Sequence, residues 1–191
     1  MRNIILISCT ALVLAALLIM GFVNSPYKYD EETGRRIIKV SIDIDRSSEE
    51  VFTYLGNSDN AEDWSVFVDH ISTLNSDKVA DGEVGSVRRC YQNPDETEGM
   101  VWDEEILERI DGQYRKLNVF NMKGFSIQAG GLLTEQIYTE KGSNSCELAL
   151  SFYFEAENPA FLDELKMFIA SYQVGRIFEK NLERIKYYNE L

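Results

Sequence analysis

The stretch AFLDELKMFIASYQVGRIFEKNLERIKYYN, residues 160–189, decides the fold of this chain, because it is the longest segment with helical periodicity. Apolar side chains recur three and four residues apart along it, which predicts one long helix with a continuous apolar stripe. Asn158-Pro159 stands directly before it and ends the preceding structure. The stripe comprises Leu162, Leu165, Phe168, Ile169, Tyr172, Phe178, Leu182 and Ile185.

The segments before this helix alternate between apolar and polar residues, which predicts strands with one buried face. Ile38–Ile44 shows the alternation most clearly. Asp111-Gly112 and the Lys-Gly-Ser-Asn sequence at 141–144 separate neighbouring strands and are typical of hairpin turns. The predicted strands are residues 38–44, 84–92, 100–110, 114–122, 132–140 and 145–156, with 71–74 as a candidate for a seventh.

Two short helices are expected between the first strand and the rest of the sheet. Ser47-x-x-Glu50 is a capping box at the start of the first helix, which ends at Gly56-Asn57. The second is expected over Ala61–Val68. A strand, two short helices, a run of antiparallel strands and one long helix together predict an α+β fold. A curved sheet of six to seven strands would wrap the long helix and leave a space between them.

The N-terminus carries a separate signal. Ile4–Val23 is an uncharged run of 20 residues, long enough to cross a hydrocarbon core of about 30 Å as a helix. We therefore predict a single-pass membrane anchor over residues 1–25, a linker over 26–35 and one domain over 36–191. A cleaved signal peptide is the alternative. Arg2 and the α-amine favour a cytoplasmic N-terminus, which would place the domain outside the cytoplasm, in a periplasm or at the cell surface.

The charge balance excludes some partners. The chain has 19 basic and 32 acidic residues and a formal net charge of −13. Such a surface repels phosphate backbones and anionic headgroups, so we expect no nucleic-acid binding and no polybasic attachment to membranes.

Three stretches then carry a resemblance to a known superfamily. Val40–Phe52 looks like a first strand running into a capped helix, Asp59–Phe67 with Trp64 looks like a second helix across a cavity mouth, and Asp81–Ser86 looks like a glycine turn entering a strand. With the element order from about Arg36 to Tyr188, the chain resembles the SRPBCC superfamily, the helix-grip fold of START-type and polyketide cyclase/dehydrase-like proteins. The resemblance implies a hydrophobic pocket. It implies no reaction, because that superfamily includes carriers, enzymes and chaperone partners.

Aromatic residues are the candidate lining of this pocket. Trp64 and Phe67 are three residues apart on the expected second helix and so share a face. Ordinary core packing is the alternative for each candidate. The full candidate set is Trp64, Phe67, Trp102, Phe120, Phe168 and Tyr172.

The sequence identifies no catalytic or metal-binding group. His70 is the only histidine, and no G-x-S-x-G or phosphate-cradling glycine loop is present, so we expect no metal and no cofactor. The resemblance also implies a strand order that separates Cys90 from Cys146 by three strands, at which distance no disulfide forms.

Three functions from different classes remain. The first is a membrane-tethered binder or carrier of a lipid-like or aromatic small molecule. The second is a cyclase/dehydratase-type enzyme acting on a polyketide-like substrate, for which Tyr138, Tyr114 or Asp103 could supply acid–base chemistry. The third is a protein-binding module of the cell envelope. The oligomeric state is not predicted.

Overall fold

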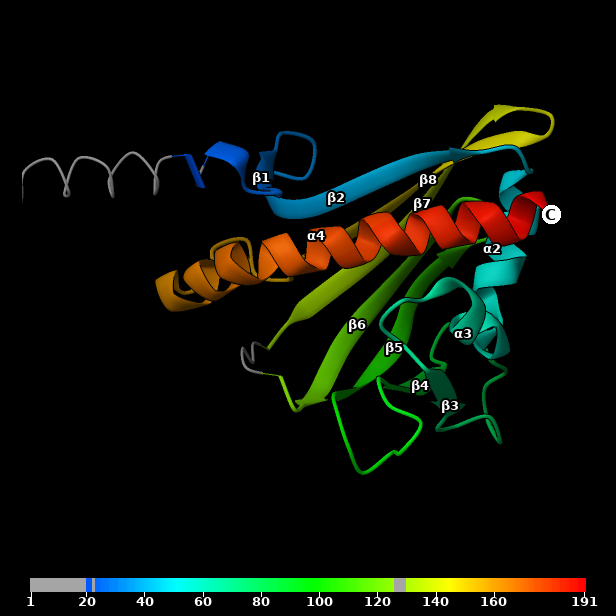
Figure 1. Cartoon of the computed structure of the whole chain (residues 1–191), viewed down its shortest axis with the longest axis horizontal. Coiled ribbons are helices and arrows are strands. Elements are labelled where there is room, and N and C mark those ends of the chain that lie inside the picture. Colours follow the sequence, from blue (N-terminus) through cyan, green and yellow to red (C-terminus); the bar gives the residue numbers. More distant parts are fainter. Residues whose placement is uncertain (1–19, 22, 126–129) are drawn as a thin grey trace, which may run out of the picture.

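The computed structural model describes residues 20–21, 23–125 and 130–191. Within this part a single antiparallel sheet curves around the long C-terminal helix (Figure 1). The elements are, in chain order, β1 (Tyr27–Asp30), β2 (Arg35–Ile44), α2 (Ser48–Gly56), the 3-10 helix η1 (Ser58–Asn60), α3 (Ala61–Trp64), β3 (His70–Thr73), β4 (Val87–Tyr91), β5 (Val101–Ile110), β6 (Tyr114–Lys123), β7 (Leu132–Gly142), β8 (Ser145–Phe154) and α4 (Phe161–Glu190).

The strand order is β1-β2-β8-β7-β6-β5-β4-β3. Strands β3 to β8 follow one another as antiparallel neighbours. Strand β2, although early in the sequence, pairs with the last strand, β8. The α+β helix-grip architecture predicted from the sequence is confirmed. The sheet of the described residues has eight strands rather than six to seven, and the candidate strand near residues 71–74 is present as β3.

The additional strand is β1, which lies in the segment predicted to be a linker. Tyr27–Asp30 pairs with β2 from Tyr27↔Ile38 to Asp30↔Arg35, across a turn in which Gly34 has a φ of 68°. The sequence Tyr27-Lys28-Tyr29-Asp30 alternates, but four residues are too few for the alternation to indicate a strand. Its stability comes from pairing along the edge of β2 and from burial of Tyr27 in the core, so the linker prediction for residues 26–35 is wrong.

Hydrogen bonds of nearby serine side chains set the start of α2 and the end of α3. The Ser47 Oγ accepts a hydrogen bond from the Glu50 backbone N–H, and the Glu50 carboxylate accepts one from the Ser47 N–H, which confirms the capping box of α2. Helix α3 ends at Trp64, four residues earlier than predicted. The reason is Ser65, whose backbone is extended and whose Oγ accepts hydrogen bonds from the Phe67 and Val68 N–H groups.

Helix α4 is continuous, but the structure buries a different face of its N-terminal half than the predicted stripe. Leu182 and Ile185 are buried, as expected for the C-terminal half. Toward the N-terminus the buried positions are Met167, Ser171 and Gly175. Ser171 and Gly175 are small, and a Cβ on Gly175 would lie 3.4 Å from the Pro26 ring, so this face is occupied by the chain that leads into β1. The exposed apolar residues of this half are Phe161, Leu162, Leu165, Ile169 and Tyr172.

The predicted membrane anchor falls mainly on residues 1–19 and 22, outside the described residues. Among the helices that the structure does describe, none combines the length and the apolar character needed to cross a bilayer.

The two described cysteines are buried and unpaired. Cys90 on β4 and Cys146 on β8 have β5, β6 and β7 between them, which confirms the expected separation. Burial raises the pKa of both thiols, which suppresses the reactive thiolate.

We therefore predict that neither of these thiols reacts with iodoacetamide in the native protein, even after expression in an oxidising compartment. Intact-mass analysis should show alkylation of both after unfolding in urea, with no reductant added. Alkylation that requires a reductant would contradict the strand order.

Candidate ligand-binding cavity

An apolar cavity lies between the middle of α4 and the concave face of strands β5 to β8. It has two adjoining lobes, with volumes of about 240 and 140 Å³. The larger lobe is lined by Phe67, Met100, Met122, Phe125, Leu132, Phe152, Phe154, Lys166, Met167, Ile169, Ala170, Gln173, Val174 and Ile177. The smaller lobe shares Phe67, Met122, Phe125, Phe152, Val174 and Ile177 with it and adds Trp102, Glu104, Val119, Thr134 and Phe178.

Three aromatic rings form one wall of the cavity. Phe67 stacks on Trp102 with ring centroids 5.5 Å apart, and Phe125 contacts both, with centroids 6.4 Å from Phe67 and 5.7 Å from Trp102. These rings come from the segment after α3, from β5 and from the segment after β6. Flat aromatic walls of this kind suit planar or aliphatic apolar ligands.

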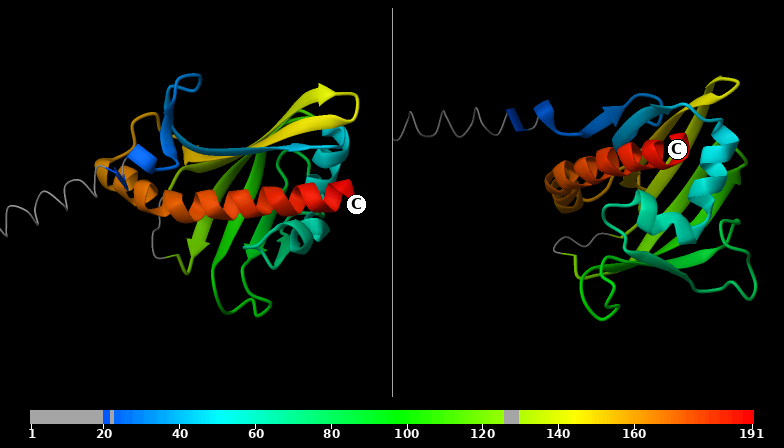
Figure 2. Two further views of the ribbon diagram at one scale, coloured as in Figure 1. Left: turned by 45° about the horizontal axis from the view of Figure 1, so that its top comes forward. Right: turned by 45° about the vertical axis from the view of Figure 1, so that its right-hand side comes forward.

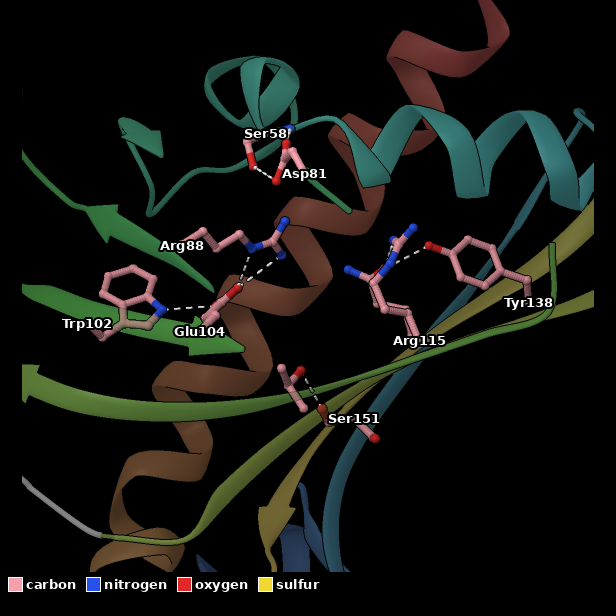
Figure 3. Close-up of polar contacts among 10 residues, drawn as sticks. Ser58, Asp81, Arg88, Trp102, Glu104, Arg115, Tyr138 and Ser151 are labelled. Atoms are coloured by element: carbon pink, nitrogen blue, oxygen red, sulfur yellow. Dashed lines mark hydrogen bonds and ion pairs between the residues drawn. The ribbon is translucent and has the colours of Figure 1, made fainter. Parts of the chain in front are cut away.

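The smaller lobe contains one carboxylate. Glu104 on β5 accepts hydrogen bonds from Arg88 Nε at 3.1 Å and from Trp102 Nε1 at 2.9 Å, and its Oε2 lies 3.0 Å from Arg88 Nη2 (Figure 3). The Arg88 side chain is only 4% exposed and that of Glu104 only 15%. Burial would lower the pKa of Arg88, but the facing Glu104 charge raises it, with a net rise. The pair is therefore a buried ion pair at the edge of an otherwise apolar space.

A second buried guanidinium lies outside the cavity. Arg115 donates to Gln136 Oε1 at 2.7 Å and to the Phe52 carbonyl at 3.3 Å, and it stacks on the Phe52 ring 4.1 Å from its centroid. Burial lowers its pKa. Gln136 also accepts from the Tyr138 hydroxyl (Figure 3). This network supports the packing of α2 on the sheet and lines neither lobe.

An outer groove of about 690 Å³ adjoins the larger lobe. The two share Phe67, Ile169, Gln173 and Ile177, so the groove is the mouth of the cavity. Its rim also includes Tyr172, Arg176 and Lys180 from α4.

The candidate residues from the sequence fall in different places. Phe67 and Trp102 lie on the cavity wall, and Tyr172 lies on the rim of the outer groove. Trp64 packs against the core cluster under α2, and Phe168 packs against the core cluster beside the cavity, but neither lines a lobe.

Phe120 is also absent from the cavity lining, for a reason found in the backbone. Val119 and Met122 both line the smaller lobe although they are three residues apart on one strand. Asn121 between them has a φ of 51°, and the pairing of β5 with β6 shifts register there, which marks a bulge. Because Val119 faces the cavity, ordinary alternation already places Phe120 on the other face of the sheet. The bulge reverses the alternation beyond Phe120, so that Met122 faces the cavity again.

The groups considered for acid–base chemistry lie outside both lobes. Asp103 is held by Arg89 and Asn121, and Tyr114 donates to Glu135. The carboxylate that does line the cavity, Glu104, was not singled out from the sequence. Trp102 and Glu104 are two residues apart on one strand and so share a face, which is the signal that could have identified it.

Comparisons with known proteins agree on the fold. No family model matches the chain, and no curated protein matches it by sequence. Among solved structures, it is similar to the protein XoxI from Bacillus cereus, with a TM-score of 0.59, 18% identity and coverage of 81% of this chain and 95% of that one. A START superfamily protein from Mycobacterium smegmatis matches with a TM-score of 0.57, 11% identity and coverage of 81% and 97%.

The di-domain aromatase/cyclase BexL, from the BE-7585A biosynthetic pathway, matches with a TM-score of 0.60 and 11% identity. The match covers 82% of this chain and 47% of BexL. At these identities the likeness concerns the fold. The chain therefore has an SRPBCC-type helix-grip fold, like START superfamily and aromatase/cyclase structures.

Proposed function

We propose that this protein binds a hydrophobic small molecule in the cavity under α4 and is held at a membrane by its N-terminal apolar run. The observation that carries the proposal is the cavity itself, whose wall is almost wholly apolar and is built from five elements, β5 to β8 and α4, and from connecting segments. Native cores are normally close-packed, so a space of this size and polarity is a candidate binding site. The fold shared with a START superfamily protein supports the same reading.

The lining suggests the chemical class of the ligand. The two lobes have volumes of about 240 and 140 Å³. Taken together, these volumes lie near the lower end of the range for ligand pockets, which is about 300–1,000 Å³. Glu104 lines the smaller lobe, and its carboxylate, although held by Arg88 and Trp102, keeps lone pairs that could accept a hydrogen bond from a ligand. The preferred ligand is therefore a small, largely aliphatic or aromatic molecule with a hydrogen-bond donor, such as a hydroxyl group, at one end.

The membrane tether is supported by the sequence. Ile4–Val23 has the length and apolar character of a single membrane-spanning helix. Placement of the domain on the extracytoplasmic side is supported by Arg2 before the run. Protease digestion of intact cells or spheroplasts tests this placement, since a cytoplasmic domain would stay protected.

The cavity proposal is tested by filling the cavity. Val174 lines both lobes, so Val174→Phe should weaken binding of the neutral fluorescent probe N-phenyl-1-naphthylamine at least about tenfold, or 1.4 kcal/mol. Leu165→Phe is the matched control, because it adds a similar bulk on α4 at an exposed position away from both lobes. A urea midpoint for each variant shows whether it is folded. Equal probe affinity in Val174→Phe, Leu165→Phe and the parent chain would contradict the proposal.

Native mass spectrometry of the full chain, followed by organic extraction, would identify a ligand that co-purifies. The expected species is an apolar molecule lost in Val174→Phe and retained in Leu165→Phe. Ligand retention that is insensitive to both changes would place binding elsewhere.

Glu104 also favours a second candidate function, an enzyme of the cyclase/dehydratase type. A carboxylate inside an apolar cavity could move a proton on a bound substrate, and BexL is an aromatase/cyclase with a similar fold. Incubation of the extracted molecule with fresh protein separates the two functions. A carrier returns the molecule unchanged, whereas an enzyme changes its mass or its absorption spectrum.

A further inference from the structure

The N-terminal half of α4 exposes an apolar face, which Gly21 contacts at Tyr172. Its members are all exposed to solvent, and at 3.6 residues per turn they fall within a sector of about 100°. We call this sector the apolar face; it consists of Phe161, Leu162, Leu165, Ile169 and Tyr172. Asp163 and Lys166 beside it form an ion pair at 2.8 Å.

The apolar face lies beside the end of the N-terminal apolar run. The Tyr172 hydroxyl donates a hydrogen bond to the Gly21 carbonyl, and Met20 and Val23 next to it are also exposed. In the left view of Figure 2 the segment around residue 20, in blue, lies close to the N-terminal half of α4, in orange, as the Tyr172–Gly21 hydrogen bond requires. Two exposed apolar residues at the end of the run, Met20 and Val23, therefore lie near the five of the apolar face.

The chain between the run and β1 is fixed to α4. Ser25 Oγ lies 3.2 Å from Ser171 Oγ, and both residues are buried. Pro26 packs against Gly175, and the Tyr27 hydroxyl donates to Glu164 Oε1 at 3.1 Å. Because Ser25, Pro26 and Tyr27 are all held in this way, the chain that follows the run has a fixed position relative to α4.

Beyond the apolar face, the same sector of α4 carries charged instead of apolar residues. From the fourth residue after Tyr172 onward it carries Arg176, Glu179, Lys180 and Glu183. A helix that is apolar where it adjoins a membrane-entering segment and charged farther along fits an oblique position in the bilayer interface. Arg176 and Lys180 have long stems that let their charges reach headgroup phosphates.

We propose that the apolar face of α4 rests in the interfacial layer of the bilayer that the N-terminal run enters. This inference relies on the membrane tether of the proposed function and adds the orientation of the domain. Ile169 and Tyr172 also line the outer groove, so the mouth of the cavity opens toward the lipid. A hydrophobic ligand would then pass between bilayer and cavity without crossing water. A bilayer fits this face better than a second copy, because two chains of net charge −13 repel each other.

The test uses the full chain in neutral phosphatidylcholine vesicles. A nitroxide spin label is attached at Leu162→Cys in a Cys9→Ser background, since Cys90 and Cys146 are buried. Tyr187→Cys is the matched control, because Leu162 and Tyr187 are 66% and 61% exposed and lie on the same sector of the same helix. Accessibility of each label to oxygen, which partitions into lipid, is compared with accessibility to a water-soluble nickel chelate.

We expect the label at 162 to have a severalfold higher oxygen-to-nickel accessibility ratio than the label at 187, with no dependence on added salt. A chain that floats with vesicles but shows equal ratios at the two positions would overturn the bilayer contact alone. A chain that does not associate with vesicles would overturn both the tether and this proposal. Spin–spin broadening between labels at 162, with low oxygen accessibility, would assign the apolar face to a second copy instead.

Discussion

Replacement of Glu104 by leucine should lower the free energy of unfolding by about 3–5 kcal/mol, because it leaves the Arg88 charge buried without a counter-ion. Arg88 is 3% exposed and takes its ion pair from Glu104. The carboxylate also accepts the hydrogen bond of the Trp102 indole, which would lose its partner. Urea unfolding at neutral pH measures the change, and added salt should alter it little because the pair is shielded from solvent.

The double variant Arg88→Met with Glu104→Leu provides the control. Replacement of both partners of a buried ion pair by apolar groups of similar size is often close to neutral, so the double variant should recover most of the stability lost in Glu104→Leu. A Glu104→Leu protein as stable as the parent chain would show that Arg88 has another anionic partner in reach. A double variant as unstable as the single one would show that packing at this edge of the cavity, and not charge pairing, dominates.

The second large effect is expected at the C-terminal half of α4. Leu182→Ala and Ile185→Ala should each cost about 2–5 kcal/mol, the range for emptying a filled core position. Leu182 is 1% exposed and Ile185 is fully buried, and both belong to the core cluster that joins α4 to α2 and β8. Truncation of the chain before Ala160 removes all α4 residues from this core cluster and should abolish folding.

Leu162→Ala is the control for these two changes. It removes the same number of atoms from the same helix, but at a position that is 66% exposed, so its effect in water should stay within about 0.5 kcal/mol. Urea midpoints of the three variants give the comparison. Equal losses at positions 162 and 182 would mean that both halves of α4 are packed to the same degree, against the burial described above.

Features that depend on neighbouring residues could be predicted from the sequence alone. The capping box of α2 needs only Ser47 and Glu50, three residues apart, and the Asp111-Gly112 turn needs only a glycine that accepts a positive φ, which at Gly112 is 66°. The extent of α4 follows from a periodicity sustained over 30 residues. In β8 the alternation also holds, because Cys146, Leu148 and Leu150, each two residues apart, pack in one core cluster.

Features that depend on distant partners required the tertiary structure. Helical spacing places apolar residues on adjacent sectors of α4 but does not say which sector meets the sheet, and the contact of Ser171 and Gly175 with the segment around Pro26 decides it. Strand β1 has almost no pattern of its own and exists because β2 offers an unpaired edge.

The cavity wall shows the same division. A bulge at Asn121 brings Met122 toward the cavity, which alternation cannot anticipate, whereas alternation from Leu117 and Val119 places Phe120 on the other face. Glu104 looks like one acidic residue among many in the sequence, and only its contacts with Arg88 and Trp102 distinguish it. The sequence by itself determined the order of the elements from β2 to α4, because these arise mainly from local interactions. Which side chains face the cavity, and which face of α4 stays uncovered, was decided by packing between residues far apart in the chain.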